Sequence, residues 1–465
     1  MMVRLAVRNI FRNRRRSLMT AALVAMGSLA LLVFGGFVTN IFAGLETGIV
    51  QNGGHLTVYR SGYFLFGPGN PAAYGIDDHE TLMHEIEADP VLHGMTRVIT
   101  TSQSLVGIAG NFSGGTSASK TFFGVGLIGA DRERMHTWND YGAGRVYPPD
   151  DRLLDPTAAR GVIGRGVARM LGLCAQLHVP NCPAPEARPA PEGAAAPLDP
   201  GLAELALGEQ GPAPDANAAP RIDLLSATAN GAPNIVGLEV AGVDIQSVKE
   251  IDDNYIAMPL ALAQQLVYGR GTHKVTAITL QLTHTADLPA ARARLTALIA
   301  EKQLPLEVRD FKEMNPFFTQ VVGMFSVIFL FLTIIMGVIV LFAVVNTMTM
   351  NVMERTNEIG TVRAMGVRRS GIRRLFLLEG ALLGGMGATF GVVLAFLAIW
   401  AINHGGFVWT PPGNTDPVPF LLAWPTRPGL LFGSWFGLVL VATLATVPPS
   451  NRAAKSRIVD ALRHV

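Results

Sequence analysis

The stretch from Phe317 to Met350 reads FFTQVVGMFSVIFLFLTIIMGVIVLFAVVNTMTM and holds 34 residues without one charged side chain. As an α-helix it would be about 51 Å long, because each residue adds ~1.5 Å. The hydrocarbon core of a bilayer is only about 30 Å thick. We therefore predict a transmembrane helix whose first residues, about ten of them, project from the membrane as a stalk, since tilt usually absorbs a smaller mismatch.

Three further apolar runs have the length of a membrane span. They cover Leu18–Phe42, Leu375–Ile402 and Gly429–Val447, and only Glu379 interrupts them with a charge. The first run has 25 residues, whereas the apolar part of a cleaved signal peptide has about 7 to 15. Charged residues make up only 15% of the chain, against roughly 25% in soluble domains. The sequence thus predicts four transmembrane helices and excludes a wholly soluble protein.

Basic residues indicate the orientation of the spans. Arginine and lysine cluster before the first span, between the second and third, and in the tail, whereas residues 403–428 contain only Arg427. Short segments rich in Lys and Arg stay in the cytoplasm. Both termini are therefore predicted inside and the large middle segment outside. From Gly44 to Phe318 this segment has 20 Lys+Arg and 30 Asp+Glu.

The middle segment has the pattern of a mixed α+β domain. Alternating runs that begin at His55 and Val275 are typical of strands, and the run from Pro289 is typical of a helix. Residues 183–220 hold 9 Pro among 38 residues, which predicts an exposed, flexible insertion. Cys174 and Cys182 lie on the oxidising side, so a disulfide is permitted; two separate thiols are the alternative.

The chain lacks the motifs of a nucleotide-hydrolysing enzyme. G-x-x-x-x-G-K-[ST] does not occur, and the dipeptide Gly-Lys is absent altogether. Gly124, Gly126 and Gly129 spell G-x-G-x-x-G, but no βαβ context follows, and we interpret the match as coincidence. No metal cluster, catalytic group or nucleic-acid motif stands out, so we expect no catalytic residue, no metal and no cofactor bound by this chain.

An amphipathic helix is predicted before the first span. Its apolar residues recur at i, i+3, i+4, i+7 and i+8, and arginines occupy another face. Such a helix suits the lipid headgroup boundary, whereas a solvated basic tail is the alternative. The apolar positions are Val3, Ala6, Val7, Ile10 and Phe11.

The stretch ERTNEIGTVRAMG, which begins at Glu354, carries a family resemblance. It resembles the permeases of the MacB, LolC/LolE and FtsX superfamily, in which the second span continues into a pattern like E-R-x-x-E-I-G-x-x-R-A-x-G. The matching residues are Glu354, Arg355, Glu358, Ile359, Gly360, Arg363, Ala364 and Gly366. RNIFRNRRRS, GHLTVYRSGY and the tail DALRHV agree with the family, and only the Pro-rich insertion departs from it.

The resemblance implies that residues 354–366, including Val362 and Met365, couple the chain to an ATPase. Physically, Asn351 with Glu354 three residues later can begin a short helix, and Gly366 can end it. Ile359, Val362 and Met365 would then form an apolar face that docks in a groove of a soluble partner. An ordinary cytoplasmic loop is the alternative.

Pairs of glycines four residues apart predict close helix packing in the last two spans. The third span holds Gly380, Gly384, Gly387 and Gly391, and the fourth holds Gly433 and Gly437. Glu379 beside them is expected to pair with Arg373 or Arg374, and snorkelling of its side chain to the membrane edge is the alternative.

These observations divide the chain into nine parts. They are the lateral helix 1–16, span 17–43, the extracytoplasmic domain 44–316, the stalk and span 317–350, the coupling loop 351–374, span 375–402, the external loop 403–428, span 429–447 and the tail 448–465.

The resemblance implies a permease subunit of an ABC transporter in the bacterial inner membrane. It would transmit motion from a cytosolic ATPase dimer, which binds ATP and Mg, and would pair with a second permease chain, identical or related. The chain begins at the lateral helix, which favours lipoprotein release or export of an amphiphile over the MacB type. A MacB-like efflux permease with a separate ATPase and an FtsX-like regulator of an envelope hydrolase are the alternatives. A periplasmic carrier, adaptor or lipoprotein would be a further partner.

Overall fold

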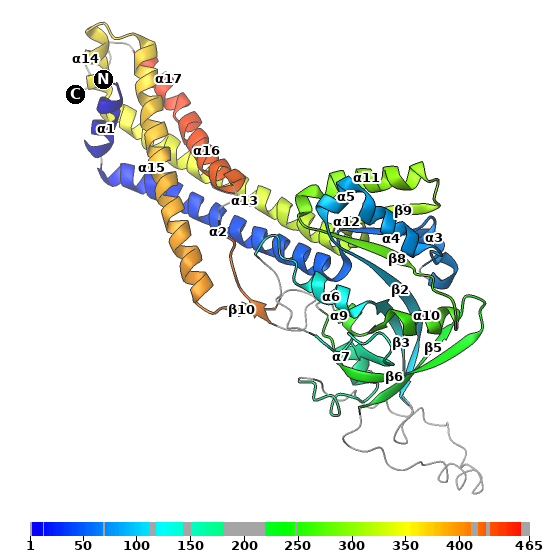
Figure 1. Ribbon diagram of the computed structural model, residues 1–465. Coiled ribbons are helices and arrows are strands. Elements are labelled where there is room, and N and C mark those ends of the chain that lie inside the picture. The colour runs from blue at the N-terminus through cyan, green and yellow to red at the C-terminus, as the bar shows by residue number, and fades with distance from the viewer. Residues whose placement is uncertain are drawn as a thin grey trace. The chain divides into compact units, whose positions relative to one another are not determined.

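The computed structural model describes residues 2–12, 14–67, 70–111, 118–142, 150–180, 182, 219–246, 249–410, 417–424 and 428–456 (Figure 1). Most of the predicted Pro-rich insertion, residues 183–218, lies outside these ranges. The chain divides into two compact units. Unit 1 comprises Met1–Ala43, Phe317–Trp409 and Val418–Val465, and unit 2 comprises Gly44–Pro316 and Thr410–Pro417.

Unit 1 is built from helices. Four helices among the described residues are long and apolar enough to cross a membrane: Arg14–Gly53, Pro316–Glu354, Arg369–His404 and Pro428–Lys455, the last containing a break. This confirms the four predicted apolar helices. The elements are α1 (Met2–Arg12), α2 (Arg14–Gly53), α13 (Pro316–Glu354), α14 (Thr356–Ala364), α15 (Arg369–His404), α16 (Pro428–Ala445), α17 (Val447–Lys455), β10 (Val408–Trp409) and β11 (Val418–Pro419).

Two of these helices are much longer than a membrane is thick. α2 has 40 residues and α13 has 39, or about 60 and 58 Å, against a hydrocarbon core of about 30 Å. The predicted stalk of α13 is thus part of one unbroken helix. α2 continues ten residues beyond its predicted end at Ala43, because residues after Glu46, such as Thr47 and Val50, are fully buried and keep the helix packed.

The core of unit 1 lies where its helices meet. Buried apolar side chains from every long helix form one cluster, so the bundle is held together by packing along its length. The cluster includes Val24 and Leu31 of α2, Val340 and Val344 of α13, Phe376 and Leu383 of α15, and Leu438 and Ala442 of α16.

The described residues of unit 2 form a sheet of nine strands, six of which close into a ring. The pairing runs β3-β7-β4-β6-β5-β2, and β2 pairs with β3 again. β2 (Thr96–Asn111) makes the closure because its 16 residues pair with β8 at one end and with β3 and β5 at the other. The other ring strands are β3 (Ala118–Leu127), β4 (Arg160–Ile163), β5 (Arg221–Ala227), β6 (Pro233–Val243) and β7 (Tyr255–Pro259).

Each ring strand contributes side chains to one buried core. Alternation along the strands sends one set of residues inward. Among them are Leu105, Phe122, Ile163, Leu224, Leu238 and Met258. α7 (Arg165–Met170) and α10 (Leu260–Tyr268) add Val167, Ala168, Ala263 and Leu266 to the same core.

The remaining strands extend the sheet from β2 in the order β8-β1-β9, which are Ala277–Leu282, Leu56–Arg60 and Leu306–Asp310. α11 packs on β9 and on α5. The other elements of unit 2 are α3 (Tyr63–Phe66), η1 (Pro71–Tyr74), α4 (His79–Ala88), α5 (Pro90–Met95), α6 (Gly129–His136), α9 (Lys249–Asp252), η2 (Thr285–Asp287), α11 (Leu288–Glu301) and α12 (Phe311–Met314). The expected mixed α+β domain is therefore present.

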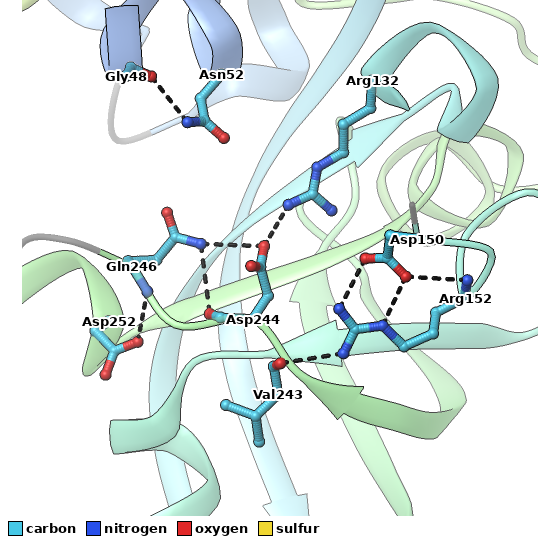
Figure 2. A network of polar contacts seen from close by, with 9 residues as sticks. All are labelled: Gly48, Asn52, Arg132, Asp150, Arg152, Val243, Asp244, Gln246 and Asp252. Carbon is cyan, nitrogen blue, oxygen red and sulfur yellow. Dashed lines mark hydrogen bonds and ion pairs between the residues drawn. The ribbon is translucent and has the colours of Figure 1, made fainter. Parts of the chain in front are cut away.

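A polar network ties the end of β6 to its neighbours (Figure 2). Arg132 of α6 forms an ion pair with Asp244, which directly follows β6. Arg152 binds both carboxylate oxygens of Asp150 at 2.7 Å and donates to the Val243 carbonyl at 3.1 Å. Because the Arg152 guanidinium faces it, the pKa of Asp150 is lowered.

Cys174 and Cys182 are joined by a disulfide with 6.0 Å between their Cα atoms.

Candidate functional site

A short helix, α14, follows the long helix α13 after a break at Arg355. The backbone of Arg355 has φ −110° and ψ 15°, which is outside the helical range, and α14 begins at Thr356. Gly366 ends the turn with φ +95°, a conformation that favours glycine, as predicted. Asn351 does not cap α14, because α13 continues through it to Glu354.

The apolar side of α14 is turned into the protein's own core. Ile359 is only 7% exposed and belongs to the same buried cluster as Ile10 of α1, Phe376 of α15 and Ala453 of α17. Val362 packs against that cluster. The expectation that Ile359 docks in a partner is therefore wrong, because its side chain is already buried within unit 1, and Val362 is partly buried against the same cluster.

Other positions of α14 and residues on both of its flanks are exposed. Met365 is 73% exposed, and Met353 at the end of α13 is 68% exposed. Asn357, Thr361 and Ala364 between them are exposed as well. We call this set the outer face of α14. Its two methionines are flexible, polarizable side chains of a kind often found at protein interfaces.

Ion pairs attach α14 and its flanks to the N-terminal segment. Arg12 of α1 lies 2.8 Å from the Glu358 carboxylate, and Arg16 of α2 pairs with Glu354. The hydrogen bond and charge of Arg12 hold the pKa of Glu358 below its usual range. Arg363 at the other end of α14 donates to the Ser456 carbonyl beyond α17.

Glu379 lies buried beside this helix, with 2% exposure. Its Oε1 accepts a hydrogen bond from Asn9 Nδ2 at 2.5 Å and another from Arg355 Nη1 at 3.2 Å. The predicted partners Arg373 and Arg374 are exposed instead. They stand six and five residues before Glu379, and at 3.6 residues per turn those positions point to other sides of α15.

Four glycines of α15 allow close contact with two different helices. A Cβ on Gly380 or Gly384 would lie 2.2 Å from Thr446 or 2.7 Å from Ala442, at α16 and its C-terminal end. A Cβ on Gly387 would lie 2.7 Å from the Ala21 carbonyl of α2. Gly391 meets α2 as well, at 2.5 Å from the Ala25 carbonyl.

The two glycines of the fourth span do not make the close helix contact that the sequence predicted. Gly433 and Gly437 have no atom within 4 Å of an added Cβ in the described part of the chain. The reason is that α16 contacts the bundle through the neighbouring positions Leu438 and Ala442. These glycines therefore do not pack helices together within unit 1.

Sequence reasoning overlooked Asn9 and Arg12. Both belong to α1, in which Ala6 and Ile10 of the predicted apolar face are buried, whereas Val7 and Phe11 are exposed. A signal was present in the sequence, because Asn9 and Arg12 are three residues apart and therefore share one side of the helix. Only the structure shows that this side of α1 faces two carboxylates, with Asn9 at Glu379 and Arg12 at Glu358.

Four long apolar helices joined to a mixed α+β unit define a multi-pass membrane protein. Within it, residues 324–458 match the FtsX-like permease C-terminal family, and this part of the chain is an FtsX-like permease domain. The match contains α14, most of α13, and α15 to α17. The resemblance inferred from the motif is thereby confirmed.

The relatives of this chain are ABC transporter permeases. The permease YtrF of Bacillus subtilis is 28% identical over 145 residues, which cover 30% of this chain and 32% of YtrF. LolC, a lipoprotein-releasing system transmembrane protein of Neisseria meningitidis serogroup B, is 27% identical over 251 residues, covering 50% of this chain and 56% of LolC. The macrolide export ATP-binding/permease protein MacB of Hyphomonas neptunium is 26% identical over 211 residues, which cover 44% of this chain and 31% of MacB. The chain thus spans less than two thirds of each relative.

Proposed function

We propose that this chain is the permease subunit of an ABC transporter in the bacterial inner membrane. Both termini lie in the cytoplasm, and unit 2 lies in the periplasm. A separate cytosolic ATPase dimer, which holds ATP and Mg, docks on α14 and moves it, and a second permease chain completes the assembly. The arginines around α1, α14 and the start of α15 support this orientation.

One observation carries the proposal. α14 buries one side in the unit 1 core through Ile359, while its outer face with Met353 and Met365 is exposed. A helix held in this way presents a rigid surface to a partner, and a groove that accepts a helix is a common mode of recognition. Movement imposed on α14 reaches α1, α15 and α17 through the ion pairs and the buried cluster.

The substrate we propose is an amphiphile extracted from the membrane, such as a lipoprotein. The similarity to LolC extends over about half of both chains and supports this choice. Efflux of the MacB kind is the second candidate, supported by the similarity to a macrolide export permease. An envelope hydrolase regulated without transport is a third role, and a complex that moves neither lipoprotein nor small amphiphile in vesicles would favour it.

The docking proposal is tested by placing a carboxylate on the outer face of α14. Met365→Asp should bury an unpaired charge in the interface, and ATPase co-purification should fall at least tenfold, since loss of a central contact costs about 2 kcal/mol or more. Met170→Asp, on an exposed methionine of unit 2, is the control and should leave assembly unchanged. Both variants should insert in the membrane normally.

Ile359→Asp is unsuitable for this purpose, because Ile359 is part of the core and its replacement would disturb folding. If Met353→Asp combined with Met365→Asp leaves ATPase binding at the wild-type level, the outer face of α14 is not the docking site.

A further inference from the structure

A buried carboxylate at the edge of a membrane span requires an explanation. Glu379 belongs to α15, one of the four candidate spans, and is 2% exposed. A charge in such a place is costly unless it is paired, and it usually has a function. The small cavity around it measures about 10 Å³ and is lined largely by polar side chains, among them Asn9, Ser17 and Asn351.

Four contacts connect five side chains in series, from Asn9 through Glu379, Arg355 and Glu358 to Arg12, and we call this set the ring. Asn9 and Arg355 both donate to Oε1 of Glu379, at 2.5 and 3.2 Å. Nε of Arg355 lies 3.2 Å from Oε2 of Glu358, and Arg12 lies 2.8 Å from Oε1 of Glu358. Asn9 and Arg12, the two ends of this series, are one turn apart on α1, so the helix backbone joins them.

The ring joins parts of the chain that are far apart in the sequence. It contains α1, the break before α14, α14 itself and α15. Arg355 is its central donor, since its guanidinium contacts Glu379 and Glu358 at once and is only 14% exposed. Without the negative charge of Glu379, Arg355 would have only one carboxylate partner, Glu358, whose side chain is half exposed.

We infer that Glu379 is a positioning residue whose charge holds the Arg355 break, and with it α14, at a defined angle to α1 and α15. This inference rests on the proposed role of α14 in docking the ATPase. Its consequence is that a permease without the Glu379 charge still binds the ATPase through the outer face of α14 but transmits its motion poorly.

The position of α14 is measured on the full-length permease in phospholipid nanodiscs, without the ATPase. Spin labels on Arg8→Cys in α1 and Thr361→Cys in α14 report the distance between two exposed sites, and the native cysteines do not interfere because they are bonded to each other. The wild-type background should show one narrow distance distribution. Glu379→Gln, which keeps the shape and removes the charge, should broaden it.

Arg374→Gln is the matched control, because it removes a charge from an exposed position of the same helix outside the ring. Its distribution should remain narrow. Asn9→Ala removes the link between Glu379 and α1 while the Glu379–Arg355 ion pair remains, and it should broaden the distribution even if Glu379→Gln folds poorly. Narrow distributions for both Asn9→Ala and Glu379→Gln would overturn the inference, as would broadening by Arg374→Gln alone.

Coupling is measured on unlabelled complexes as ATP turnover of the assembly relative to the ATPase alone. We expect Glu379→Gln to co-purify the ATPase normally and to lower this ratio about fivefold or more, within the usual range of coupling between sites. An unchanged ratio with wild-type assembly would overturn the coupling role. The docking proposal is tested separately. If it is wrong, Met365→Asp will still co-purify the ATPase, whereas the spin-label distances, which are measured without the ATPase, will not be affected.

Discussion

At the scale of single residues, buried polar side chains are the most informative groups in this chain. Glu379 is one of them, and His55 in unit 2 is another. His55 is fully buried, accepts a hydrogen bond from the Leu282 backbone N–H at Nδ1 over 3.0 Å, and contacts Thr285 Oγ1 through Nε2 at 3.1 Å. Because Nδ1 is an acceptor, the ring fits its place only in the neutral form.

Burial lowers the pKa of His55 to about 4, and the nearby Asp140 charge offsets only part of this. An unfolded histidine has a pKa of about 6.5. The unfolded state therefore binds more protons between pH 6.5 and 4, and stability falls as the pH falls through that range. At pH 5 this amounts to about 2 kcal/mol. Hydrogen exchange at the Leu282 amide should accelerate from pH 7 to pH 5, after correction for intrinsic exchange, and less so in His55→Asn. Equal acceleration in both proteins would contradict this assignment.

At the scale of elements, α15 is the helix on which unit 1 is assembled. Its glycines face two partners, since Gly380 and Gly384 meet the α16 side while Gly387 and Gly391 meet α2. Ser28 of α2 donates to the Ala388 carbonyl at 3.2 Å, which shows how close the two backbones come. Small residues allow this approach in a membrane, where helices associate by packing.

Gly391→Leu should therefore separate α15 from α2. The added side chain would meet the Ala25 carbonyl, and overpacking of this kind costs about 1–3 kcal/mol or more. Gly437→Leu is the control, because no described atom lies within 4 Å of its Cβ position. Thermal stability of the purified permease, followed by size-exclusion chromatography, should drop for Gly391→Leu alone. If both variants lose thermal stability equally, the loss in Gly391→Leu does not come from its packing against α2.

At the scale of the whole molecule, two unbroken helices connect the units. α2 begins in unit 1 and ends in unit 2, and α13 begins at Pro316, the residue at which unit 2 passes into unit 1.

The orientation of the molecule is testable with two single cysteines. Asn230→Cys lies in the turn between β5 and β6 of unit 2, and Arg369→Cys lies at the exposed start of α15. An impermeant maleimide added to spheroplasts should label the former and not the latter, because Arg-rich segments remain inside. Both should react after permeabilisation. Labelling of Arg369→Cys from outside would contradict the proposed topology.

The sequence by itself determined the features that depend on local composition. Runs without charge, such as Phe317–Met350, specify a helix in lipid because every backbone group must be paired within the span. Gly366 predicted the end of α14 because few other residues adopt φ +95° without strain. The motif around Glu354 was enough to identify the FtsX-like domain.

Only the tertiary structure decided which surfaces meet. The apolar face of α14 was evident from its periodicity. Burial of Ile359 in the bundle and burial of Ile359 in a partner remove the same apolar surface from water, so the periodicity does not distinguish between them. Arg373 and Arg374 were near Glu379 in sequence, whereas Asn9 and Arg355 reached it through the packing of other helices. The closure of six strands into a ring likewise depends on pairing between distant segments, which a pattern of alternating residues does not encode.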